Sequence, residues 1–572
     1  MNAERARDAE RALWTIVWLA VVSVGLNTWS SWSLWSGFSV VAPALILLGS
    51  VGVVLVWTVP ARHQSDLEHA ALCVALGTVV VTYAPSMLAA RYFNTDAAAF
   101  NQRATWLLAH GKNPYAAIFR GANVALSHAA TYWTYLLNGG HVNQVSYPAG
   151  SFVLQLPLQW LGVHSLGTNW LDLAAWLSAS LFLYFVSPPS ARWLAPLLLL
   201  TSVYTFSFAH GGTDALFIPF LMVAAYRWDH FVIEGARWTR WLGPLALGVA
   251  CSIKQTPWFC VPFFVLGVVL ESSGRQRRVG RDVASYLAAV SLPFVLLNLP
   301  FVLWSPSQWW RGATLPLREP LVPDGQGLVT LTTHGLLHVL YPERLQWSAA
   351  LALAALLVAY WHWYPTLKST WLFVLPVVLF LPSRSLSSYL VDFVPVAFVM
   401  ALSTRRTISR SLNPRRRWYV LAPAVCSLVL AVSAFVGNPL GIRLNDVHVT
   451  RVGLRFTTMS LTLTNYTSTP VRPHVMVIVG SAHPVGFWSF VGAPAGVTLG
   501  AHQVRTYVVR APQLMYTPAR YENWLIEVTS SSPAFVVTTA PQRWRRGPNH
   551  SLSDGRVSAT TSTHETRARV RG

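Results

Sequence analysis

One acidic residue, in a polar stretch between apolar runs, is the side chain best placed to do chemistry. Asp96 lies in RYFNTDAAAFNQRATWLLAHGKNPY, residues 91–115, directly after an apolar run. The residues that follow form a good helical sequence that stops at Gly111, so Asp96 could simply cap the N-terminus of an amphipathic helix. A carboxylate in this position could also accept a proton as a general base. The two roles are compatible, and these residues alone favour the cap; the case for a catalytic Asp96 depends on the motifs that accompany it.

Two basic residues could bind an anion near this carboxylate. Lys254 lies at the centre of the apolar run 241–270, where a lysine is costly unless it faces a cavity or a partner. Two short helices that turn near Lys254 would bring it to the side of Asp96; a lysine snorkelling along one tilted helix is the alternative. Arg384, in LPSRSLSSYLVDF, is expected on the same side, either as a phosphate partner or as plain loop balanced by Asp392.

A wider set of polar and aromatic residues flanks the same segments. Arg91 and Lys112 share the loop with Asp96 and could bind a phosphate, although each could equally be a surface residue. Asp214 could cap a helix or contact a sugar, and Trp309–Trp310 could anchor the chain in the membrane interface or stack on a sugar. The residues predicted to bind substrate are Tyr115, Tyr147, His210, Asp214, Trp309 and Trp310.

The composition places these residues in a membrane protein. Of the 572 residues, 53% are hydrophobic and 11% are charged, whereas soluble domains carry about 25% charged residues. The sequence predicts an all-α polytopic protein with about 11–13 transmembrane helices. The expected spans are 13–30, 36–58, 69–90, 149–164, 169–187, 192–209, 211–227, a hairpin-like run 241–270, 285–304, 346–362, 365–382, 385–402 and 418–436.

The basic residues predict how the chain lies in the membrane. The net charge of +21 is concentrated in short loops beside apolar runs, such as Arg275–Arg278 and Arg405–Arg417. This distribution is the positive-inside pattern and argues against nucleic-acid binding. Residues 1–12 are therefore expected in the cytoplasm and the loop 91–148 outside a cytoplasmic membrane. Seven apolar runs precede Arg237, but an even number is required, so one run is a half-span or a broken helix.

The character of the chain changes after the last apolar run. Residues 441–543 alternate with period two, as in LNDVHVTRVGLRFTTMSLTLTN, and Pro, Gly and Asn separate the alternating stretches. This pattern predicts an external, Ig-like β-sandwich. We expect it to be self-contained, not required for the chemistry, and suited to positioning an acceptor or a partner. The basic, aromatic-poor tail 544–572 is expected to be disordered.

The order of the motifs between residues 70 and 400 resembles the GT-C superfamily of integral-membrane glycosyltransferases. After Asp96 and its helix come GKNPY, SYPAG, HGGTD from His210 to Asp214, and CSIKQTP around Lys254. The resemblance is closest to the polyprenyl-phosphate-sugar branch, which includes polyprenol-phosphate-mannose-dependent mannosyltransferases. It implies a polyprenyl-phosphate-sugar donor, a glycan, glycolipid or protein acceptor, and an acidic catalytic base in the first large external loop, where Asp96 lies.

The residues themselves are compatible with this chemistry. Inverting transfer needs one base and a stabilised leaving group, and not the two carboxylates that glycosidases use. The leaving phosphate needs Arg or Lys, for which the sequence offers Lys254, Arg384, Arg91 and Lys112. Relatives carry a second acid beside the base, whereas this chain has Asn94, so a divalent metal is not indicated. No cofactor is expected, since the chain has no P-loop, HExxH, CxxC or GxSxG.

Two functions of other classes are the alternatives to a glycosyltransferase. A transporter or flippase for lipid-linked sugars would predict inverted repeats with paired broken helices, which the sequence does not show. A membrane anchor that displays the β-domain for binding would need a single span. The number of apolar runs argues against this second alternative.

Overall fold

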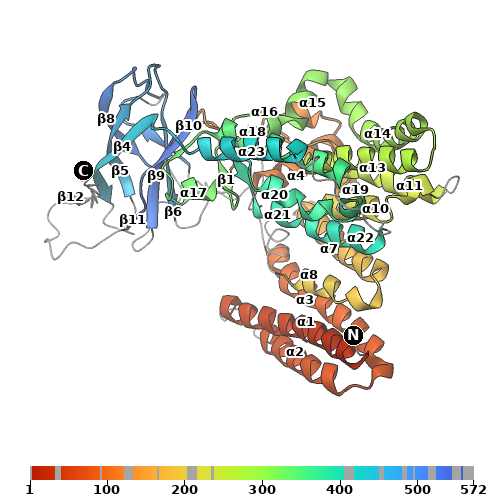
Figure 1. Cartoon of the computed structure of the whole chain (residues 1–572). Helices are drawn as coiled ribbons and strands as arrows, with labels where there is room; N and C mark the ends of the chain where they lie inside the picture. The colour runs from red at the N-terminus through yellow and green to blue at the C-terminus, as the bar shows by residue number, and fades with distance from the viewer. Residues whose placement is uncertain are drawn as a thin grey trace, which may run out of the picture.

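The protein consists of a helical part and a C-terminal β-sheet domain that lies at one end of it (Figure 1). The computed structural model describes most of the chain, and the statements below concern those residues only. They are 3–32, 40–89, 93, 95–120, 133–163, 167–201, 215–233, 238–404, 418–449, 456–479, 486–493, 496–512, 523–543 and 556–557.

Seven helical segments are long and apolar enough to cross a membrane. They are α1 (Ala3–Trp32), α2 (Val41–Thr58), α3 (Gln64–Ala89), α7 (Gly167–Val186), α13 (Val261–Gly274) with the preceding 3₁₀ turn η8 (Thr256–Cys260), α14 (Val279–Trp304) and α18 (Pro342–His362). The chain is therefore a multi-pass membrane protein. Shorter apolar helical segments cover Ala215–Ala225, Ser387–Ser403 and Trp418–Ser433.

Fewer than the predicted 11–13 long helices form because proline interrupts several apolar runs. The predicted span 365–382 is divided into α19 (Tyr364–Leu367), the 3₁₀ turn η9 (Trp371–Phe373) and α20 (Leu375–Leu379). Proline stands in the first turn of both α19 and α20. Proline lacks an N–H group, so it is tolerated at the start of a helix and breaks its interior.

The predicted span 149–164 does not form one long helix. It forms α5 (Gly150–Val153) and α6 (Leu156–Trp160), and both short helices pack against α4 (Asp96–Ala109). The hydroxyl of Thr105 in α4 donates to the carbonyl oxygen of Phe152, 3.0 Å away. This segment is thus held against α4 and is too short to span, which fits the half-span predicted among the apolar runs before Arg237.

The run 241–270 is a helical hairpin, as predicted. Helix α12 (Leu242–Ile253) ends at Lys254, whose backbone is extended, and η8 and α13 follow. Helix α14 packs against both arms. Gln255 at the turn donates to the carbonyl oxygens of Ser146 and Ala313, at 2.9 and 2.7 Å. The turn therefore lies at the same end of the helices as the loop that carries Asp96.

The basic loops lie at the opposite end. Helix α7 begins beside α4, where Thr168 Oγ1 donates to the carbonyl oxygen of Ala98 at 3.4 Å. It runs away from α4 towards Arg192, which lies 4.0 Å from Glu68 near the start of α3. The guanidinium of Arg277, between α13 and α14, pairs with Asp282 at 3.2 Å. The loops at Arg192 and Arg277 thus lie at the end opposite to Asp96, whereas Arg405–Arg417 lie outside the described residues, and the predicted cytoplasmic side stays a prediction.

The β-domain is one curved sheet and not the predicted sandwich of two separate sheets. In order across the sheet, its strands are β12 (Arg556–Val557), β4 (Leu440–Val449), β5 (Phe456–Asn465), β8 (Val504–Arg510), β7 (Phe487–Phe490), β6 (His474–Val479), β9 (Asn523–Ser531), β10 (Ala534–Thr538) and β2 (Val339–Leu340), with β11 (Gln542–Arg543) on β9. The period-two alternation predicted its buried face correctly. Strand β7 pairs with both β6 and β8, so the two halves are continuous and fold around one core as a half-barrel.

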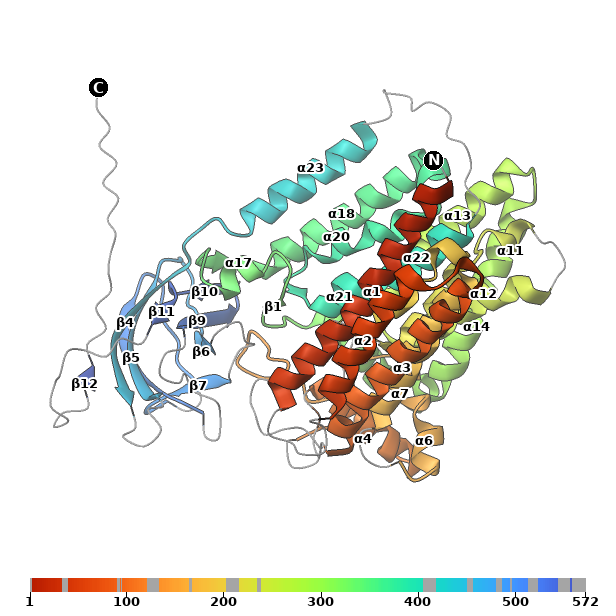
Figure 2. The same ribbon diagram turned by 90° about the horizontal axis from the view of Figure 1, so that it is seen from below.

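The sheet extends beyond the predicted limits of residues 441 and 543. Strand β2, which belongs to the helical part, pairs with β10 through Leu340 and Val536. Residues 556–557, inside the predicted tail, pair with β4. Helices α18 and α23 (Trp418–Ser433) lie side by side and lead into the sheet from the helical part (Figure 2). The two parts are therefore joined by a shared sheet as well as by the chain.

The arrangement of the ends can be tested by labelling. In a chain without its four native cysteines, Lys112→Cys and Arg278→Cys place a thiol at exposed positions at opposite ends of the helical part. A membrane-impermeant maleimide should modify one variant from one side of sealed vesicles and the other only from the opposite side. Labelling of both from the same side would contradict the arrangement.

Candidate functional site

The carboxylate of Asp96 is held by the backbone and side chain of a distant residue. Its Oδ2 accepts from the amide of Thr134 at 2.7 Å, and its Oδ1 accepts from Thr134 Oγ1 at 3.2 Å. The capping role considered for Asp96 belongs to Thr95, whose hydroxyl accepts from the amide of Ala98 at 3.3 Å. Asp96 is the first residue of α4, where the helix dipole favours a negative charge.

Arg384 is connected to this carboxylate through the same threonine. Its guanidinium donates to Thr134 Oγ1 at 3.2 Å and lies 3.9 Å from Asp324 Oδ2. Arg384 and Asp324 are paired residues of two short parallel strands, β3 (Arg384–Ser385) and β1 (Asp324–Gly325). A Cβ on Gly325 would lie 2.1 Å from the carbonyl oxygen of Ser385, so only glycine permits this pairing. Segments far apart in sequence thus meet at Thr134.

Lys254 joins the cluster from the turn of the helical hairpin. It is 3% exposed, and its Nζ lies 4.8 Å from the ring centre of Tyr389 and 5.8 Å from that of Tyr147. It interacts electrostatically with Asp392 and Asp172 and, unfavourably, with Arg384. The snorkelling alternative for Lys254 is therefore wrong, because the ammonium group is buried among carboxylates.

The surroundings of Asp96 act on its pKa in opposite directions. Asp96 is 7% exposed, and this burial raises the pKa of its carboxyl group, while the hydrogen bonds from Thr134 and the charge of Arg384 lower it. Burial also lowers the pKa of His141 nearby, against the attraction of Asp96. A carboxylate with a raised pKa is a better proton acceptor near neutral pH than one in water.

The structure brings some predicted residues together and separates others. Tyr147 lies at Lys254, and the buried Tyr115 donates its hydroxyl proton to the carbonyl oxygen of Tyr147 at 2.8 Å, so Tyr115 supports the site. Lys112 lies beyond the far end of α4, about 20 Å from Asp96 along the helix. The structure therefore does not place Lys112 at the site. Predicted residues outside the described part of the chain are Arg91, His210 and Asp214.

The tryptophan pair lies in α15 (Pro306–Ala313). Trp309 donates from Nε1 to Asn298 Oδ1 at 3.0 Å, and the same oxygen accepts from the amide of Ala149 at 2.9 Å. Trp310 is 55% exposed. Trp309 therefore has a packing role that fixes α15 to α14, and Trp310 remains accessible.

Sequence reasoning missed several members of the cluster. Asp172 lies in the membrane-spanning helix α7 and is fully buried; an acid inside an apolar run is a signal that could have identified it. Tyr389 lies in LPSRSLSSYLVDF, the stretch considered for Arg384, and Asp324 lies in a loop, but neither residue is unusual in its setting. Thr134 carries no signal in the sequence, since only the fold brings it to Asp96.

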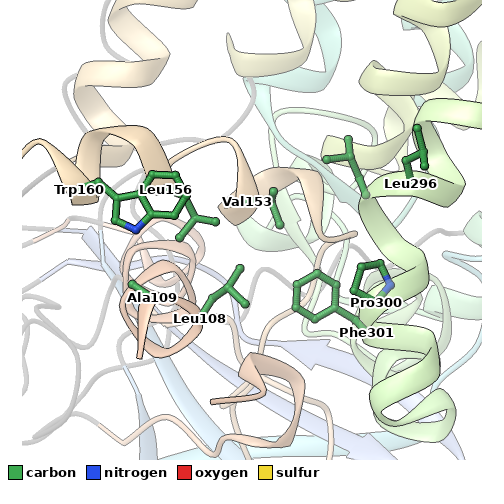
Figure 3. Close-up of a pocket in the computed structure, with 9 residues that line it drawn as sticks. Leu108, Ala109, Val153, Leu156, Trp160, Leu296, Pro300 and Phe301 are labelled. Carbon is green, nitrogen blue, oxygen red and sulfur yellow. The ribbon is translucent and has the colours of Figure 1, made fainter. Parts of the chain in front are cut away.

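An apolar groove lies close to the cluster. It has a volume of about 350 Å³, and side chains from α4, the α5–α6 segment and α14 point toward a common space (Figure 3). Asp96, Lys254 and Arg384 do not line it. Phe301 of the groove lies 5.7 Å, ring to ring, from Tyr115, which is hydrogen-bonded to Tyr147. One aromatic layer therefore separates the groove from the residues around Lys254. The groove is lined by Leu108, Ala109, Val153, Leu156, Trp160, Leu296, Leu297, Pro300 and Phe301.

No metal site stands out in the described residues, where no group of three or more His, Cys, Asp and Glu side chains is arranged to hold an ion. The carboxylates of Asp96 and Asp324 are instead in contact with Thr134 and Arg384. Comparisons with known proteins add no candidate function, because no protein-family model, curated protein or solved structure matches the chain. The resemblance noted in the sequence therefore rests on the motifs alone.

The charge cluster predicts a specific pattern of stability. Lys254→Met removes the cation between Asp392 and Asp172 and leaves buried carboxylates unbalanced, which should cost on the order of 3 kcal/mol of stability. Asp392→Asn in the same chain should recover much of this loss. Thermal unfolding in detergent measures both, with the exposed Lys112→Met as the matched control. An unfolding temperature for Lys254→Met equal to that of the control would show that these charges do not interact.

Proposed function

We propose that the protein is a GT-C-like, inverting glycosyltransferase that uses a polyprenyl-phosphate-linked sugar of the mannose type or similar. The acceptor would be an envelope glycan, glycolipid or protein, and the reaction would take place at the external face of a bacterial cytoplasmic membrane. The observation that supports this most is the Asp96 carboxylate, linked through Thr134 to Arg384, at the end of the membrane-spanning helices. One base beside a cation meets the needs of inverting transfer.

In this reaction Asp96 acts as the general base. Asp96 takes the proton of the acceptor hydroxyl while the hydroxyl oxygen bonds to the anomeric carbon of the donor sugar. The bond between that carbon and the phosphate oxygen breaks, and its electron pair leaves with the phosphate. The products are the glycosylated acceptor, the polyprenyl phosphate and protonated Asp96, which returns its proton to solvent.

The leaving phosphate would bind to Arg384, and Lys254 would supply a second positive charge nearby. Arginine has five N–H donors in a planar fork, so Arg384 can keep its contacts with Thr134 and Asp324 and still bind a phosphate oxygen. The carboxylates around Lys254 hold its ammonium group in position. Because the cluster contains more acids than bases, a bound phosphate must compete with Asp324 and Asp392 for Arg384 and Lys254.

The apolar groove would hold the hydrocarbon chain of the donor lipid. Its lining is almost wholly apolar, and Trp160, on its rim, is 72% exposed. An isoprenoid chain can therefore enter from the membrane without passing a polar barrier. The aromatic layer of Phe301 and Tyr115 ends at Tyr147, next to Lys254, so the phosphate end of a lipid in the groove would face the cations.

The role of Asp96 predicts the effect of a nearly isosteric change. Asp96→Asn should leave expression and folding nearly intact, since Thr95 caps α4 and Asn can still accept from Thr134. It should lower the rate of sugar transfer by about 100-fold or more, because an amide cannot take the acceptor's proton. Transfer from a radiolabelled polyprenyl-phosphate sugar in membranes measures this, with the exposed Asp66→Asn as control. A transfer rate near that of the wild type would exclude Asp96 as the base.

The role of Arg384 predicts weaker donor binding. Arg384→Gln should lower the affinity for a polyprenyl-phosphate sugar by about tenfold or more, because a hydrogen bond to a charged phosphate oxygen is lost. The exposed Arg318→Gln is the matched control. Titration of the donor into nanodiscs that contain each variant measures the affinity. An affinity equal to that of the control would place the phosphate elsewhere.

A further inference from the structure

The residue that holds Asp96 belongs to a hairpin whose tip touches the β-domain. Residues 133–142, here called the Thr134 hairpin, are closed by the amide of Val142, which donates to the carbonyl oxygen of Thr134 at 2.8 Å, and by a bridge between Tyr135 and His141. Thr134 therefore stands at the base of the hairpin, next to Asp96. The tip contains Asn138, Gly139 and Gly140.

Three contacts attach the hairpin to the β-domain. Thr529 Oγ1 in β9 donates to the carbonyl oxygen of Leu137 at 3.3 Å. The ring of Tyr135 packs edge-on against Phe487 of β7, 5.4 Å between ring centres. His474 of β6 lies against Gly139 so closely that a Cβ on the glycine would be 2.3 Å from Nδ1 of the histidine.

The same interface reaches the partner of Arg384. The amide of Val322 donates to the carbonyl oxygen of Tyr135 at 2.9 Å, and Asp324 follows two residues later. Glu527 in β9 is fully buried. Burial raises the pKa of its carboxyl group to about 8, and the negative charge of Asp324 acts in the same direction. The carboxyl group of Glu527 is therefore largely protonated at neutral pH, which allows the two acids to approach. The β-domain thus contacts the Thr134 hairpin directly, and one of its buried acids lies near Asp324, the partner of Arg384.

We propose that the β-domain is a positioning element of the catalytic centre, in which His474, Thr529 and Phe487 clamp the Thr134 hairpin so that Thr134 holds Asp96. This inference rests on the proposed function and replaces the expectation that the chemistry does not require the domain. Without the clamp the hairpin moves, and Asp96 loses the amide and hydroxyl bonds that orient it. Whatever binds to the β-domain can then alter the basicity of Asp96 without entering the site.

Gly139 offers a selective test. Gly139→Ala puts a methyl group into His474, whereas Gly492→Ala, in a turn of the β-domain, meets no atom within 4 Å. The two glycines have nearly equal positive φ angles, +84° and +82°, so the backbone strain is matched. His474→Ala in the Gly139→Ala chain opens the space that the methyl group needs, and it separates the clash from the strain.

The transfer reaction supplies the first readout. Gly139→Ala should lower the single-turnover transfer rate about tenfold or more, with little change in the apparent affinity for a polyprenyl-phosphate sugar, and Gly492→Ala should not. The bonds from Thr134 lower the pKa of Asp96, so their loss raises it. Asp96 is then protonated at a higher pH, and the acid limb of the pH–rate profile moves upward. The titratable groups that face Asp96 are His141, Tyr135 and Tyr389, and the charged group that faces it is Arg384.

The second readout does not depend on activity. Hydrogen–deuterium exchange of residues 133–142 should be faster in Gly139→Ala than in the wild type or Gly492→Ala. Adding His474→Ala removes the clash but keeps the contacts of Thr529 and Phe487, so it should restore part of the protection and of the rate. If Gly139→Ala matches Gly492→Ala in exchange and in pH profile, the clamp does not exist. If the wild type transfers no sugar while the exchange pattern appears as expected, the clamp is real and the proposed function fails.

Discussion

A buried carboxylate needs hydrogen bonds or an opposite charge, and the arrangement around Asp96 follows from that requirement. The amide and hydroxyl of Thr134 supply the hydrogen bonds, and Arg384 supplies a positive charge at the other side of the same hydroxyl. Taking an ionised carboxylate out of water without such partners costs several kcal/mol. The loop that carries Asp96 is therefore stable in this form only if the Thr134 hairpin and the β3 strand are in place. This dependence connects the helical part, the loops and the β-domain at one point.

The same constraint explains why the helices break where they do. A lysine in the middle of a continuous membrane-spanning helix would face hydrocarbon, but the extended backbone at Lys254 turns the chain and places the ammonium group among Asp392, Asp172 and two aromatic rings. The short α5–α6 segment stays at the same end because it packs on α4. Broken helices are tolerated at such a depth where they are buried in protein. The turn at Lys254 and the α5–α6 segment thus both lie at the end that holds Asp96.

Much of the helical part was predictable, because apolar length and loop charge are strong signals. The hairpin at Lys254 and the alternating face of the β-sheet were predicted correctly. The number of long helices was not, since proline divides runs that are apolar enough to span. The sandwich became a single sheet because β7 pairs in both directions, a feature that alternation in the sequence cannot reveal. Of the site, Asp96, Lys254 and Arg384 were found by their unusual settings, whereas Thr134 and Asp324 are ordinary loop residues that only tertiary contacts select.

The proposed mechanism requires that a polyprenyl phosphate binds at the end of the helices where Asp96 lies. The most direct measurement is an electron cryo-microscopy map of the full chain in lipid nanodiscs with a polyprenyl phosphate bound. The phosphate density should lie within hydrogen-bond distance of Arg384, with no protein between it and the Asp96 carboxylate. The hydrocarbon chain should lie in the groove between α4 and α14. Phosphate density at the basic end near Arg192 and Arg277, or density shielded from Asp96 by protein, would contradict it.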